Sequence, residues 1–148
     1  MLQSTLQAYY DWLAEEPIEH NIIIDKYGNV WHTEGDKTSV NPSNKIDLDG
    51  AIDIHNHANY PHSFSKRDLN SIFNNKNTNF LLVDKDYIYK IRAIKRPSID
   101  FNSYYNQGLE EAIKNGFDYK EQEHNAMLKM QKEGLVYYER KPRNGTIK

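Results

Sequence analysis

The sequence predicts an α/β fold in which helices flank one β-sheet. Three features of the chain lead to this prediction. It opens with an amphipathic segment, continues with two pairs of short apolar runs that are each joined by a tight turn, and closes with two segments of helical periodicity. With 148 residues, of which 38% are hydrophobic and 27% charged, the chain has the size and composition of one globular domain, and we expect a single domain over residues 1–148.

The N-terminal segment, residues 1–17, predicts one amphipathic helix over residues 5–16. Ser4 is the expected cap of this helix, because its hydroxyl can accept a hydrogen bond from an unpaired amide of the first turn. Apolar, β-branched runs at residues 21–24 and 29–33 follow, separated by a turn-forming stretch. These two runs predict a β-hairpin.

The middle of the chain divides into four predicted segments: a polar loop over residues 35–48, a strand over 51–55, a loop over 58–64 and a helix over 65–75. Alternation along the strand places Asp53 and His55 on one face. The loop over 35–48 is longer than average, and such loops in compact domains are often functional. We expect both loops to border a functional cleft.

The rest of the chain predicts a second hairpin and further helices. We expect strands at 79–83 and 87–94, helices at 103–114 and 119–132 within a C-terminal helical segment 98–138, and a solvated basic tail at 140–148. The order helix, hairpin, strand, helix, hairpin, helices is typical of an α/β layout around one sheet.

Composition excludes several kinds of site. The chain has no cysteine, which rules out disulfides, thiolate zinc sites and cysteine nucleophiles. A formal net charge of −2 and a pI near 6.3 provide no general attraction to nucleic acid or anionic lipid, so neither is expected as a partner. No stretch approaches the ~20 apolar residues of a membrane span, and no secretory signal is evident, so we expect a cytoplasmic location.

One short stretch carries the spacing of a metal site. His55 and His57 are separated by one residue. Ser65 follows His57 after seven intervening residues, and Asp68 follows Ser65 after two. On a strand the two histidines project to the same face, and Asp68 lies one turn into the next helix, where its carboxylate can turn back towards them. Two imidazoles and one carboxylate bind Zn²⁺ well and leave the fourth tetrahedral position for water, which is typical of a catalytic site.

The pattern His-x-His, seven residues, Ser-x-x-Asp resembles the zinc motif of the JAMM (MPN) metallopeptidases, especially their RadC-like and small phage-associated members. The resemblance extends from about Glu19 to Tyr138. It implies a curved mixed sheet flanked by helices, with layers like those of cytidine deaminase. It also implies that zinc is bound by three ligands, His55, His57 and Asp68.

The same resemblance implies the chemistry of the site. Glu19, directly before the first strand, would be the general base, and Ser65 would stabilise the oxyanion. The reaction implied is hydrolysis of a peptide or isopeptide bond in a peptide or protein substrate. The usual proline after the second histidine is replaced by Ala58, and no long insertion of the kind that clamps ubiquitin is present.

Other interpretations of these residues stay open from the sequence. Ser65 and Asp68 also fit an ordinary helix cap, a role compatible with the metal site. Glu34 is an alternative general base, and either Glu34 or His62 could supply a fourth metal ligand. Such a ligand would favour a second function class, a catalytically silent JAMM-like domain used for binding or assembly, for example in a phage particle.

Two other enzyme classes do not fit the sequence. Residues 55–57 read His-Asn-His, but in HNH nucleases the letters H, N and H name residues spread over a longer motif, so this contiguous match does not indicate a nuclease. A zinc nucleotide deaminase needs a cysteine pair and a His-x-Glu motif, and the sequence has neither.

Overall fold

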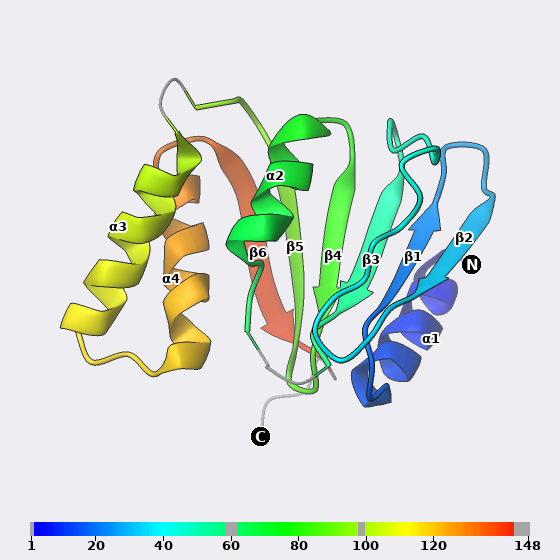
Figure 1. Cartoon of the computed structure of the whole chain (residues 1–148), viewed down its shortest axis with the longest axis horizontal. Coiled ribbons are helices and arrows are strands. Elements are labelled where there is room, and N and C mark those ends of the chain that lie inside the picture. The colour runs from blue at the N-terminus through cyan, green and yellow to red at the C-terminus, as the bar shows by residue number, and fades with distance from the viewer. Residues whose placement is uncertain (1, 59–61, 98–99, 144–148) are drawn as a thin grey trace.

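In the computed structural model, which describes residues 2–58, 62–97 and 100–143, the chain forms a six-stranded mixed sheet with four flanking helices (Figure 1). The strands are β1 (His20–Ile24), β2 (Val30–Glu34), β3 (Ile52–Asn56), β4 (Asn79–Val83), β5 (Tyr87–Ala93) and β6 (Val136–Pro142). The helices are α1 (Leu2–Glu15), α2 (Lys66–Asn74), α3 (Phe101–Lys114) and α4 (Tyr119–Lys132). The strand order is β2-β1-β3-β4-β5-β6. The α/β prediction is confirmed.

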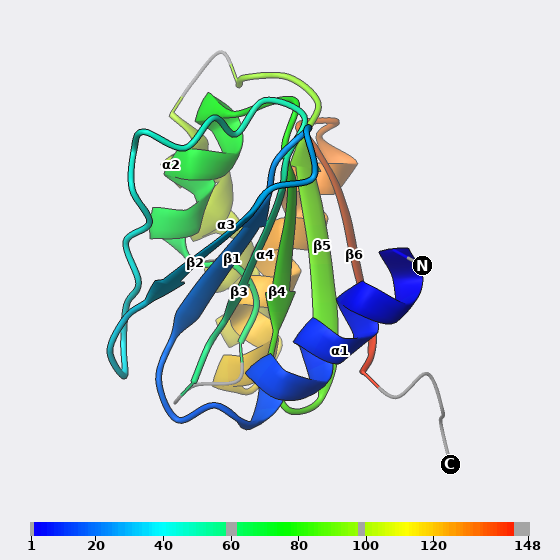
Figure 2. The ribbon, with the colours of Figure 1, turned by 90° about the vertical axis from the view of Figure 1, so that its right-hand side faces the viewer.

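Helices cover the two faces of the sheet unequally. Helix α1 lies alone on one face, and α2, α3 and α4 lie on the other (Figure 2). On the α1 side, Leu13 belongs to a small buried cluster with Ile54 of β3. On the opposite side, Leu69 of α2 and Met127 of α4 belong to a larger cluster with Leu82 of β4. The sheet therefore separates two hydrophobic cores, and the candidate site residues of β3 lie on the side of the larger one.

The pairing around β3 brings three chain segments together at one end of the sheet. Strands β3 and β4 are parallel, and α2 connects them, which is the usual arrangement of a parallel crossover. Strand β1 runs antiparallel to β3, with Asn21 opposite His55. The start of β1 consequently lies beside the end of β3, from which the chain continues into α2. Crevices at the carboxyl ends of strands are common ligand sites in open α/β sheets.

Most predicted elements are found within a few residues of their expected bounds, including both hairpins. Ser4 is an exception, because α1 already begins at Leu2 and the serine lies inside the helix instead of capping it. The first turn of a helix tolerates a serine well, since its amides lack intrahelical partners in any case. None of the described helices is long and apolar enough to cross a membrane.

Two predictions for the end of the chain are wrong. Residues 136–138, expected within the C-terminal helical segment 98–138, and residues 140–142, expected in a solvated basic tail, belong to strand β6. Residues 144–148 of the expected tail lie outside the described part. Strand β6 pairs antiparallel with β5 at the edge of the sheet. Buried Val136 and Tyr138 alternate with exposed neighbours, as expected for a half-buried strand. Arg140 belongs to this strand: its guanidinium lies 4.2 Å from the centre of the Tyr87 ring and donates to Glu121 at 3.0 and 3.1 Å. Its charge is therefore paired within the fold.

Candidate metal centre

His55 and His57 lie at the carboxyl end of β3 and just beyond it. Because Ile54 packs in the cluster on the α1 side, its neighbour His55 faces the other side, towards α2. His55 is 8% exposed. The amide of His57 donates to the carbonyl of Val83 at 3.2 Å, so the chain continues along β4 for one residue after the strand. This contact holds His57 on the same face as His55.

Asp68 reaches the same place from the first turn of α2. Ser65 caps this helix, and its Oγ accepts from the Asp68 amide at 3.2 Å. The Asp68 carboxylate in return accepts from the Ser65 amide at 2.8 Å. The expected capping role is therefore confirmed. This reciprocal pair fixes both the start of the helix and the direction of the Asp68 side chain.

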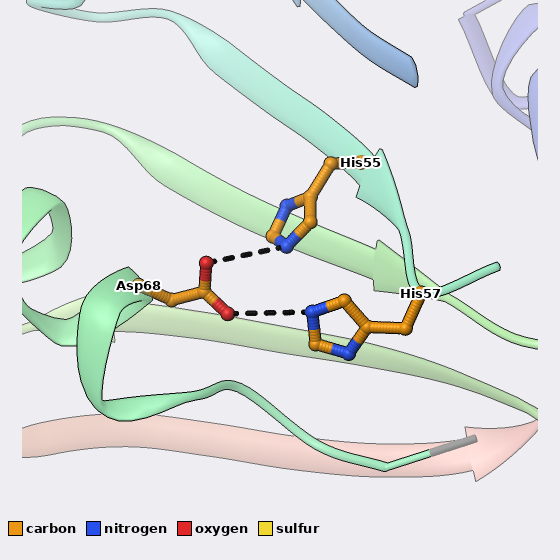
Figure 3. A group of neighbouring side chains, drawn as sticks. All are labelled: His55, His57 and Asp68. Carbon is orange, nitrogen blue, oxygen red and sulfur yellow. Dashed lines mark ion pairs between the residues drawn. The ribbon is translucent and has the colours of Figure 1, made fainter. Parts of the chain in front are cut away.

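The three side chains converge as a metal site requires (Figure 3). Nε2 of His55 lies 3.4 Å from Oδ1 of Asp68, and Nε2 of His57 lies 3.5 Å from Oδ2. Good N–H···O hydrogen bonds are shorter, about 2.7–3.2 Å. Ligand atoms around tetrahedral zinc are about 3.3 Å apart when its bonds are about 2.0–2.1 Å long. Buried Nε2 of His55 also has no hydrogen-bond partner among the described residues. This group could hold a metal ion.

The orientation of His57 is set by its other ring nitrogen. Nδ1 donates to the carbonyl oxygen of His62 at 3.0 Å. That hydrogen bond fixes the tautomer in which Nε2, facing Asp68, is the unprotonated nitrogen. Metal-binding histidines are commonly held in this way by an acceptor behind the ring.

The electrostatics of the centre favour a positive charge beside Asp68. Burial alone would raise the pKa of the Asp68 carboxyl, but the neighbouring His55 and His57 hold it well below its usual range. Burial is the largest single influence on the pKa of His55 and lowers it, but Asp68, Asp53 and Glu19 together outweigh burial and raise this pKa to about 9. Burial lowers the pKa of His57. In the absence of a metal a proton on His55 supplies the positive charge, a role that a divalent cation would take over.

Glu19 lies directly before β1 and lines the same cleft as the three ligands. Its amide donates to the carbonyl of Asp36 at 2.7 Å, and its carbonyl accepts from the Gly35 amide at 2.8 Å, so both sides of its backbone are held. The residue is 9% exposed, and burial raises the pKa of its carboxyl to about 7. Glu34 is exposed on edge strand β2 and is not among the residues that line this cleft.

Asn56, between the two histidines, faces away from the metal centre and joins β3 to the segment that carries Glu19. Its Oδ1 accepts from the amide of His20 at 2.7 Å, and its Nδ2 donates to the carbonyls of Leu13 and Ile18 at 3.2 and 3.0 Å. The side chain is 1% exposed. These bonds fix the chain on either side of Glu19 relative to β3.

We expect Asn56→Ala to lower the free energy of unfolding by about 2–4 kcal/mol, because it leaves the His20 amide and the Ile18 carbonyl without partners and removes one of the two donors to the Leu13 carbonyl. Urea denaturation of the metal-free protein would measure this. Asn44→Ala is a matched control, since Asn44 is exposed in the 35–48 loop and should change the stability by less than about 0.5 kcal/mol. Equal effects of the two substitutions would contradict the bridging role of Asn56.

The cleft over the centre has a volume of about 350 Å³. Both predicted loops contribute to it: residues 38–42 from the first, and His62 and Phe64 from the second, whose residues 59–61 lie outside the described part. Sequence reasoning singled out neither Asn21, Asp53 nor Arg67 as functional, and all three line the cleft. For Asp53 the signal was present, because strand alternation puts it on the face of His55.

The remaining histidines lie outside the metal-binding group of the described residues. Nδ1 of His62 lies 2.9 Å from both the Ser63 carbonyl and a Glu123 carboxylate oxygen. His124 contacts the Tyr138 hydroxyl at 2.6 Å. His20 is buried on β1, with Nδ1 at 2.9 Å from Nε2 of His32 on β2. The group that could hold a metal thus consists of three protein ligands, without His62 or Glu34.

Comparisons of the chain with protein-family models, with curated proteins and with solved structures find no match.

Proposed function

We propose that this protein is a zinc-dependent hydrolase that cleaves an amide bond in a peptide or protein substrate. The observation that carries the proposal is a group of three side chains that could hold a metal ion, in an open cleft that also contains a buried carboxyl, Glu19. Structural zinc sites have four protein ligands, whereas catalytic ones have three and keep one position for water or substrate. The motif's resemblance to JAMM metallopeptidases supports the same assignment.

Zinc held by His55, His57 and Asp68 would polarise the scissile carbonyl and lower the pKa of a water at its open position to about 7. In the proposed mechanism Glu19 accepts the proton of the attacking water and passes it to the nitrogen of the leaving amine. A carboxyl whose pKa lies near 7 suits both steps, because it can hold and release a proton at neutral pH.

Ser65 is the proposed donor to the oxyanion that forms when water adds to the carbonyl. Its hydroxyl oxygen accepts a hydrogen bond from the Asp68 amide, and that bond does not use the hydroxyl proton. The residue lines the cleft, so this proton can be directed towards substrate. One side chain can therefore cap α2 and stabilise developing negative charge.

Ser65→Gly separates these two roles, because glycine at an N-cap costs only a few tenths of a kcal/mol. We expect the free energy of unfolding to change by that small amount and kcat to fall about 10²–10³-fold, the usual cost of losing an oxyanion donor. Ser65→Thr retains the hydroxyl and should retain most of the activity. Wild-type kcat in the glycine variant would contradict the oxyanion role.

The proposed function is tested by exposing the zinc-loaded protein to a mixed-sequence peptide library and identifying new termini by mass spectrometry. Cleavage that is lost after chelation, restored by zinc and nearly absent in Glu19→Gln is the expected result. No cleavage by a protein that carries a full zinc complement would contradict the hydrolase assignment and favour a binding or assembly role.

A further inference from the structure

The floor of the cleft contains a polar pair that the proposed mechanism does not use. Asp53 precedes His55 by two residues on β3, and Asn21 of β1 lies opposite His55 in the sheet. Nδ2 of Asn21 donates to Oδ1 of Asp53 at 2.7 Å. Asp53 is 6% exposed and Asn21 is 4% exposed, and both line the cleft. The two side chains thus form a buried, hydrogen-bonded polar pair beside the proposed metal ligands.

This pair offers hydrogen-bond acceptors without matching donors. Oδ1 of Asn21 is buried and has no hydrogen-bond partner in the part of the chain that the structure describes. Within the same part, the one hydrogen bond to the Asp53 carboxylate comes from Asn21. Buried polar atoms are nearly always paired, because leaving one without a partner is costly. The arrangement therefore suits a ligand that brings several donors.

The charge of Asp53 points to the same kind of ligand. No arginine, lysine or histidine of the described residues forms an ion pair with it, whereas Asp68 lies against both His55 and His57. Arg67, the one arginine among the residues described as lining the cleft, donates instead to the side chain of Asn41. A buried carboxylate usually has a cationic partner, because an isolated buried charge is costly.

We propose that Asp53 and Asn21 form an ammonium-binding subsite, so that the preferred substrate carries a protonated amine close to the scissile amide. In naming the substrate class, this inference rests on the proposed hydrolase function. An ammonium group supplies three N–H donors and one positive charge, which matches the two acceptors and a carboxylate that has no ion-pair contact among the described residues. Residues two apart on a strand are separated by about 6.6 Å, so the subsite lies about two residues' length of extended chain from the metal ligands.

Two sources of ammonium fit that distance: the free N-terminus of a peptide and the side chain of a lysine. Matched probes distinguish them. For the N-terminus, trialanine is compared with N-acetyl-trialanine. For the side chain, N-acetyl-lysyl-alanine amide is compared with N-acetyl-norleucyl-alanine amide, which has the same aliphatic chain without the amine.

Affinities are measured by calorimetry on Glu19→Gln protein, so that binding is observed without turnover, both with and without zinc. We expect the amine-bearing member of at least one pair to bind about tenfold more tightly than its neutral twin, as hydrogen bonds to a charged group predict. Preference in the trialanine pair alone assigns the subsite to an N-terminus, and preference in the lysine pair alone assigns it to a side chain.

Asp53→Asn is the decisive variant, because it removes the charge and keeps the shape. In this variant the amine-bearing probe should bind at most about twofold more tightly than its neutral twin, while the affinity of the neutral twin stays unchanged. We call this ratio of affinities the amine advantage. Asn21→Ala removes the second acceptor and should reduce the advantage by a smaller factor, which keeps the test informative if Asp53→Asn does not fold. Asp86→Asn removes the same charge from an exposed position outside the cleft lining and should leave the advantage intact.

The subsite is overturned if neither amine-bearing probe is preferred at millimolar concentration. It is also overturned if Asp53→Asn leaves the preference unchanged, or if Asp86→Asn reduces it equally. Failure of the proposed function gives a different result. Amine-selective binding without any peptide cleavage would support the subsite and contradict the hydrolase function. Zinc-dependent cleavage with no amine preference would support the hydrolase function and contradict the subsite.

Discussion

Replacing His57 with alanine is expected to reduce bound zinc from about one ion per chain to near zero. The wild-type group supplies three ligand atoms within 4.8 Å of one another, and the variant retains only His55 and Asp68. Loss even of a residue behind a metal ligand typically weakens binding 10–100-fold, about the least that loss of the ligand itself should cost. Elemental analysis by mass spectrometry after dialysis against buffer of neutral pH measures the stoichiometry, and His55→Ala should behave in the same way.

His32→Ala is the matched control for this experiment. The pair formed by His20 and His32 is another place in the described structure where two imidazoles meet, and Glu16 lies 2.8 Å from Nε2 of His20. The ring nitrogens of this pair are 2.9 Å apart and hydrogen-bond each other, so they are engaged without a metal. The assignment of the centre would be contradicted if bound zinc were lost in His32→Ala and retained in His57→Ala. It would also be contradicted if the wild-type protein were purified without metal at neutral pH.

The candidate metal centre could be predicted because each of its parts follows a local rule. Alternation along one strand puts His55 and His57 on the same face, and a capping box determines where α2 begins and which way Asp68 turns. The structure brings the three together as expected. Glu19 is a different case, because its place beside them depends on antiparallel pairing of β1 with β3. No periodicity in the sequence specifies that pairing, so only the family resemblance pointed to it.

The parts that sequence reasoning missed depend on tertiary contacts. Arg140 belongs to a run of basic residues that is typical of a solvated tail, and only the packed structure supplies Glu121 and the Tyr87 ring as its partners. Strand alternation places Asn56 on the face opposite the histidines, but it does not identify the acceptors of this side chain, which are backbone carbonyls about 40 residues earlier in the chain. The Asp53–Asn21 pair is likewise made across two strands. Polar residues whose partners are distant in sequence look the same as exposed ones until the fold is known.

Glu19→Gln is expected to separate catalysis from stability. The variant keeps all three metal ligands, so it should bind zinc in the wild-type ratio. Its amide side chain cannot accept the proton of the attacking water, so the rate of hydrolysis should fall about 10²–10⁴-fold, the usual contribution of a general base. Parallel measurements of zinc content and kcat check this. A variant that hydrolyses peptide at the wild-type rate would exclude Glu19 as the base.

Although Glu19→Gln should lose activity, the metal-free variant should be more stable than the metal-free wild type at high pH. Burial raises the pKa of this carboxyl from 4.5 to about 7 in the folded protein, so ionising it is harder in the folded state than in the unfolded state. The wild type therefore loses stability as the pH rises from about 4.5 through 7, and the glutamine variant, which has no charge to bury, does not. Each unit of pKa corresponds to about 1.4 kcal/mol, and we expect the variant to be more stable by about 1–3 kcal/mol at pH 8.

Below pH 4.5 the two proteins should be nearly equal in stability, because Glu19 is then protonated in both the folded and the unfolded state. Urea denaturation at pH 8 and pH 4 measures the difference, and an equal advantage at both values would show that packing, and not the buried charge, is its cause.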